Sequence, residues 1–204
     1  MDTVDLQVRT ALLAEKAETL PPAEHALLER IQAFSFDDGA PALPFADRLA
    51  RENGWGPRHA QRAIEEYRRF VFLAIVAGHP VTPSDQVDQV WHLHLLYTRH
   101  YWNTFCATIL RHDLHHQPTV GGPEEGRKFA RWYEGTLASY RRYFGNPPSD
   151  IWPAAAIRFG DDTHHARVNL RRNIIISKTQ LGCVIELATA AVLALLLVAS
   201  GWMS

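Results

Sequence analysis

Histidines, acids and aromatic residues crowd into one stretch of this chain, residues 81–118. Six of the protein's 11 histidines lie there: His92, His94, His100, His112, His115 and His116. Histidine is the commonest metal ligand and the side chain that titrates nearest to neutral pH. This density predicts metal binding, proton chemistry or buried hydrogen bonding within the stretch.

Helix geometry sorts these side chains by face. At about 100° per residue, Asp88 and His92 share one face and lie one turn apart, whereas His94 points about 200° away from His92. A carboxylate and an imidazole at that spacing can converge on one cation, or the carboxylate can orient the imidazole N–H. Three interpretations stay open for the pair: a metal site, an acid–base pair without metal, and a buried ion pair between helices. His94 lies among apolar residues and is predicted to be a hydrogen-bonded core histidine.

A metal site needs more ligands than Asp88 and His92, and the histidines after the predicted helix are the nearest supply. His115 and His116 are the candidates, and the expected cofactor is a divalent, zinc-like ion. If the helix ran its full length, the loop would have to cross about 25–30 Å to return to His92. The predicted site therefore needs a helix break near 98–100 or a loop that folds back. Four residues are predicted to support the ligands from outside the site or to have a structural role: Asp85, Trp91, His94 and His112.

The elements that would position these residues are all helical, because apolar residues recur at helical spacing between prolines and glycines and no convincing strand pattern appears. Helices are predicted at Val4–Thr19, Ala23–Phe34, Phe45–Asn53, Pro57–Ala77, from Thr82 or Ser84 to about Leu110, at Glu124–Phe144 and at Trp152–Phe159. The predicted fold is an all-α, helical bundle-like domain followed by a C-terminal transmembrane helix. The expected domains are 1–42 (N-terminal helices), 43–158 (main helical domain), 159–180 (polar linker) and 181–203 (tail anchor).

The apolar run from Leu181 to Met203 is the basis for the predicted membrane span. Its one charged residue is Glu186. As a helix the run would extend about 34 Å, against about 30 Å for a bilayer core. Basic residues precede it and no charge follows it, so the positive-inside rule predicts a single-pass, tail-anchored protein whose N-terminal domain is cytoplasmic.

Composition excludes several classes of protein. A formal net charge of -1 gives no bulk electrostatic reason to expect a nucleic-acid partner. The two cysteines, Cys106 and Cys183, lie in different kinds of segment, which argues against a disulfide framework. The acidic N-terminus has no apolar core of a signal peptide. Phosphate-loop, Gly-x-Ser-x-Gly, Cys-x-x-Cys and His-Glu-x-x-His motifs are all absent from the sequence.

A family resemblance rests on V-D-x-V-W-H-x-H, which begins at Val87 and ends at His94. This element resembles the core signature of the glycine-rich domain-containing protein group, known in plants and also found in bacteria and fungi. Its continuation is similar at Tyr101, Cys106, His112–Asp113 or His115–His116, Phe129–Pro148 and Asp150–Pro153. The resemblance implies little about activity. The chain has no glycine-rich tail, so the nucleic-acid-binding region suggested for the plant proteins has no counterpart here.

Together these patterns predict a tail-anchored membrane protein with a centre of Asp88, His92 and a histidine from 112–116. If the centre is catalytic, a bound metal would support hydrolysis, or Asp88 and His92 would transfer protons. The alternative is a non-enzymatic scaffold that recruits a protein partner to the membrane, with the cluster as a structural clasp. Whether the chain is an enzyme stays open at this point.

Overall fold

The computed structural model describes residues 20–37, 39–160 and 174–201, with the side chains at 178 and 193–201 outside the described set. The chain divides into two compact units, residues 1–163 and 164–204, and each is described by itself. The helix predicted at Val4–Thr19 lies outside the described residues.

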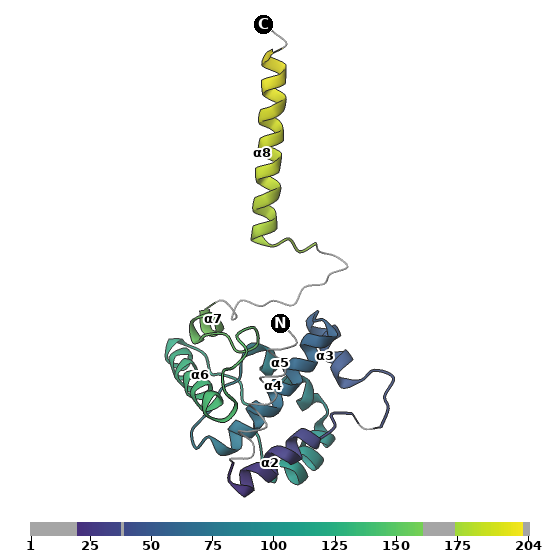
Figure 1. Cartoon of the computed structure of the whole chain (residues 1–204), viewed down its shortest axis with the longest axis vertical. Coiled ribbons are helices and arrows are strands. Elements are labelled where there is room, and N and C mark those ends of the chain that lie inside the picture. Colours follow the sequence, from purple (N-terminus) through teal and green to yellow (C-terminus); the bar gives the residue numbers. More distant parts are fainter. Residues whose placement is uncertain (1–19, 38, 161–173, 202–204) are drawn as a thin grey trace. The chain divides into compact units, whose positions relative to one another are not determined.

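Every regular element in the described ranges is helical, which confirms the all-α prediction (Figure 1). The elements are α2 (Pro22–Ala33), α3 (Phe45–Asn53), α4 (Pro57–Val76), α5 (Asp85–Leu96), the π-helix η1 (His100–Leu110), α6 (Pro123–Phe144), α7 (Ala155–Gly160) and α8 (Lys178–Gly201).

Local signals account for most of these boundaries. Helices α2, α4 and α6 each begin at a proline, whose missing N–H costs nothing in a first turn. Helix α3 ends at Gly54, which adopts a left-handed φ of 68° and donates its N–H to Ala50 O. A glycine takes this conformation without the steric penalty of a Cβ. The predicted bounds of α3 and α6 therefore agree with the structure to within one residue.

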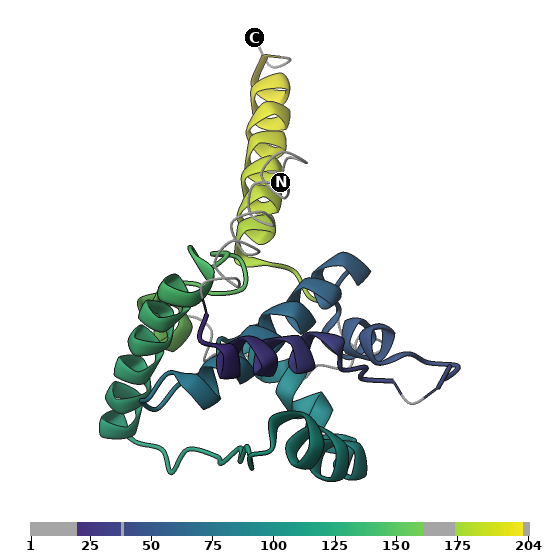
Figure 2. The ribbon, with the colours of Figure 1, turned by 60° about the horizontal axis from the view of Figure 1, so that its bottom comes forward.

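Helix α4 is the central element of the first unit, because α2, α3, α5 and α6 all pack against it (Figures 1 and 2). Its buried face is rich in aromatic residues, among them Tyr67, Phe70 and Phe72. A buried carboxylate lies on the same helix: Glu66 is 4% exposed. It accepts hydrogen bonds from three donors: Arg69, Tyr140 and Trp152. This network joins α4 to α6 and to the segment that follows α6.

The long helix expected from Ser84 to Leu110 is two elements. Helix α5 is capped by the Ser84 hydroxyl, which accepts from Val87 N–H, and it ends at Leu96. Tyr97 then leaves the helical region with φ -84° and ψ 52°, and η1 begins at His100. The break lies next to the 98–100 segment where a metal site would need it. Figure 2 shows the long connection that leaves η1 and returns to α6.

The predicted tail anchor over 181–203 is wrong. Within the described part of the chain, no helix has both the length and the apolar character that a bilayer crossing demands. Three predictions built on the anchor are wrong with it: the transmembrane helix in the fold class, the membrane as partner, and the single-pass localisation with a cytoplasmic domain.

Candidate metal centre

Helix α5 supplies two of the three groups at the centre, Asp88 and His92. They lie one turn apart, and His92 Nε2 is 3.8 Å from Asp88 Oδ2. The Ser84 cap and the acidic first turn fix where α5 starts, and hence which face carries the two side chains. The Asp88 side chain is 19% exposed and the His92 side chain 49% exposed. The pair therefore lies at the edge of the core, with its imidazole on the solvent side.

The third group, His116, comes from the connection between η1 and α6. Its Nε2 lies 2.9 Å from Asp88 Oδ1, and its ring centroid lies 4.6 Å from that of His92. One ligand atom from each of Asp88, His92 and His116 lies within 4.8 Å of the others. These three residues form a group that could hold a metal ion.

The path of the chain explains how His116 reaches α5. Because α5 ends at Leu96, η1 is free to take another direction, and it ends at Arg111, which has a left-handed φ of 55°. A positive φ is uncommon for a residue with a side chain, and it reverses the chain here. His112 N–H closes the turn by donating to Cys106 O at 3.2 Å. Because of the helix break and this reversal, the loop does not have to cross the about 25–30 Å that an unbroken helix would have placed between it and His92.

The other predicted site residues fall outside the group. His115 is exposed, and its ring lies 5.3 Å from that of Trp102. His112 is exposed at the turn, and Asp85 occupies the first turn of α5. Of the two neighbouring candidates, only His116 faces Asp88. Trp91 is buried, with its ring centroid 4.5 Å from that of His116.

His94 lies on the opposite side of α5, inside the core. It is 1% exposed, and its Nδ1 lies 3.1 Å from the Tyr67 hydroxyl. Burial, together with smaller electrostatic contributions from His100 and Arg68, lowers the pKa of His94 to about 3. The imidazole is therefore neutral at pH 7. Aromatic rings surround it, including Phe36, Tyr101 and Phe105.

Sequence reasoning gave no role in the site to the Tyr101 hydroxyl. Tyr101 is fully buried, and burial raises its pKa. It accepts a hydrogen bond from Trp91 and donates one to Leu114, two residues before His116. A pattern search for metal ligands does not detect such a residue, because its partners are set by the path of the loop.

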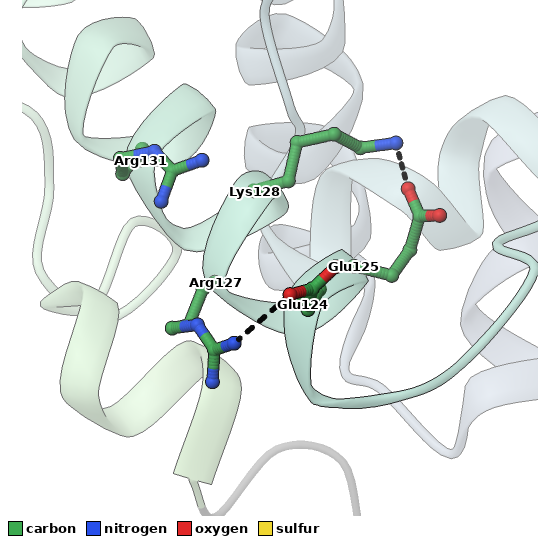
Figure 3. Close-up of a pocket in the computed structure, with 5 residues that line it drawn as sticks. All are labelled: Glu124, Glu125, Arg127, Lys128 and Arg131. Carbon is green, nitrogen blue, oxygen red and sulfur yellow. Dashed lines mark ion pairs between the residues drawn. The ribbon is translucent and has the colours of Figure 1, made fainter.

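A separate hollow lies on the surface at the start of α6 (Figure 3). Its lining residues are Glu124, Glu125, Arg127, Lys128 and Arg131. Ion pairs join Arg127 to Glu124 at 3.9 Å and Lys128 to Glu125. Because each carboxylate already faces a cation and no histidine lines the hollow, it does not offer a set of metal ligands.

Comparison with known proteins places this site within a recognised region. Residues 29–128 match the model of the UCP032817-like family, and this range contains α5, η1 and all three ligand candidates. Glycine-rich domain-containing protein 2 of Arabidopsis thaliana is 26% identical over 125 residues, which cover 58% of this chain and 15% of the relative. The chain thus spans a small part of that relative's length. No solved structure matches the chain. The family match and this relative together support a glycine-rich domain-containing-like family for the matched region of the chain.

Proposed function

We propose that this domain binds a divalent transition-metal ion, zinc-like in its preferences, through Asp88, His92 and His116. The observation that carries the proposal is the convergence of one carboxylate and two imidazoles within 4.8 Å. Two histidines and a carboxylate are a donor set that zinc and other first-row divalent ions accept. Magnesium and calcium prefer sets made of oxygen atoms alone, so they fit this group less well.

The distances within the group suit an ion with little movement of the chain. Two ligand atoms bound to one tetrahedral zinc at about 2.1 Å are separated by about 3.4 Å. The separations from the Asp88 carboxylate, 2.9 Å from Oδ1 to His116 Nε2 and 3.8 Å from Oδ2 to His92 Nε2, fall on either side of this value. Small rotations of the His92 and His116 side chains would bring both to the ligand distance.

The group also has an open side. Three protein ligands leave at least one coordination position, which is the pattern of catalytic rather than structural zinc sites. The open position would face solvent, because the His92 side chain is 49% exposed. A metal in such a site lowers the pKa of a bound water toward about 7. The supported chemistry is therefore hydrolysis or proton transfer, with Asp88, His92 and His116 as the ligands that would hold the ion.

A metal-free clasp is the second candidate, and one observation favours it. Asp88 and His116 already share a 2.9 Å hydrogen bond, which ties the connection after η1 to α5 without any ion. In that case the cluster is structural, and the domain acts as an interaction module for a protein partner. The two candidates differ in one measurable property, the metal content of the purified protein.

The test is elemental analysis of protein purified without chelators, followed by titration with zinc and cobalt(II). We expect one equivalent of metal in the wild type, and its loss in Asp88→Ala, His92→Ala and His116→Ala. The matched control is His115→Ala, which removes an exposed imidazole next to the site and should keep the metal. A folded wild type that contains no metal and binds neither ion would overturn the proposal in favour of the clasp.

A further inference from the structure

The third ligand candidate lies in a segment that regular secondary structure does not hold. His116 belongs to the connection between Leu110 and Pro123, where the described residues form no helix. A metal ligand must keep its position to within a fraction of an ångström for tight binding. Some other interaction must therefore hold this part of the chain beside α5.

A buried chain of hydrogen bonds supplies that interaction. The Trp91 indole N–H donates to the Tyr101 hydroxyl at 2.9 Å, and that hydroxyl donates to the backbone carbonyl of Leu114 at 2.5 Å. Trp91 is 6% exposed, Tyr101 is 0% exposed and Leu114 is 8% exposed. Because water is excluded from all three, the loss of one partner leaves a buried polar group unpaired.

Both ends of this chain of hydrogen bonds lie close in sequence to a ligand candidate. Trp91 precedes His92 in α5, and its indole ring packs edge-on against the His116 ring at 4.5 Å. Leu114 precedes His116 by two residues, so its fixed carbonyl limits where the His116 backbone can lie. One tyrosine hydroxyl thus links the helix that carries two ligands to the loop that carries the third.

We propose that Tyr101 is a positioning residue for the metal centre: its hydroxyl holds Leu114, and thereby His116, in the place where His116 can share an ion with Asp88 and His92. This inference rests on the proposed function. Groups that orient metal ligands from outside the coordination sphere typically change metal affinity by about 10- to 100-fold when they are removed. We expect a weakening of that size when the Tyr101 hydroxyl is lost.

The test compares Tyr101→Phe with a matched tyrosine elsewhere in the domain. Tyr133 is also fully buried, and its hydroxyl also donates to a backbone carbonyl, Pro153 O, at 2.8 Å. Tyr133→Phe therefore removes the same kind of hydrogen bond far along the chain from the ligands. Zinc affinity is measured for the wild type and both variants by competition with a chromophoric chelator. Cobalt(II) absorption spectra report the geometry of the bound ion.

We expect Tyr101→Phe to bind zinc about 10- to 100-fold more weakly and to shift or broaden the cobalt spectrum, whereas Tyr133→Phe binds like the wild type. Trp91→Phe, which removes the donor to Tyr101, is a second variant and should also weaken binding. Metal binding by Tyr101→Phe that equals the wild type, with an unchanged spectrum, would overturn this inference and leave the metal site standing. A wild type that binds no metal would instead refute the proposed function.

Discussion

His94 should make this domain sensitive to acid, and the effect can be isolated with one substitution. Burial lowers the pKa of His94 from its ordinary value of 6.5 to about 3. In the unfolded chain the ring regains its ordinary pKa, so between these two values the unfolded state binds a proton that the folded state does not. The stability that depends on keeping the His94 ring neutral is therefore fully present above about pH 6.5, and it is lost as the pH falls toward 3.

The loss in the free energy of unfolding can be calculated from the pKa values of His94 in the unfolded and folded states. Each pKa unit corresponds to about 1.4 kcal/mol, so the full difference is of order 5 kcal/mol below pH 3. Between pH 7 and pH 5, where the unfolded ring becomes almost fully protonated, the expected loss is about 2 kcal/mol. This is a large share of the stability of a small domain, which is typically about 5–15 kcal/mol.

The assay is urea unfolding at pH 7, 6 and 5 in the presence of a chelator, which removes any contribution from bound metal. In His94→Gln the side-chain amide offers both a donor and an acceptor to the Tyr67 hydroxyl but cannot take up a proton. This variant should lose about 2 kcal/mol less than the wild type between pH 7 and pH 5. His112→Gln, which removes an exposed histidine, is the control and should follow the wild type. If His94→Gln loses stability as steeply as the wild type does, the ring is not excluded from protonation in the folded state and the reasoning is refuted.

Three further predictions concern stability. Glu66→Ala should destabilise the domain by about 3–5 kcal/mol, because the partly buried Arg69 and the buried Tyr140 and Trp152 lose a charged acceptor. A loss of less than about 1 kcal/mol in the free energy of unfolding, measured in urea, would contradict this. Gly54→Ala should cost about 1–2 kcal/mol because Gly54 has a left-handed φ, whereas Gly126→Ala, inside α6 with open space around it, should stabilise by up to about 1 kcal/mol. Equal changes in melting temperature for the two would refute the backbone argument. Zinc at about 100 times its dissociation constant should raise the free energy of unfolding of the wild type and of His115→Ala by about 2.7 kcal/mol. The same zinc concentration should not stabilise His116→Ala, and thermal denaturation measures the difference.

The amino-acid sequence alone determined the parts of this protein that depend on local geometry. Proline and glycine at the helix ends and apolar residues at helical spacing led to the all-α class and to the bounds of α3 and α6. The convergence of Asp88 and His92, and the placement of His94 on the other side of α5, also follow from the period of one helix. These features need no knowledge of distant contacts.

The prediction made from hydropathy at residues 181–203 was wrong. The apolar run after Leu181 led to a predicted membrane span, and no described helix meets the requirements of one.

Only the tertiary structure decided which histidine completes the centre. His115 and His116 are neighbours of the same type, so composition and spacing cannot separate them. The choice depends on where α5 ends, how the chain reverses at Arg111 and where the loop is held. Those features arise from contacts between residues far apart in the chain, such as the packing of Trp91 against His116 and the hydrogen bond from Tyr101 to Leu114. Such contacts form only once the helices have packed, because the partners are not adjacent in any single element.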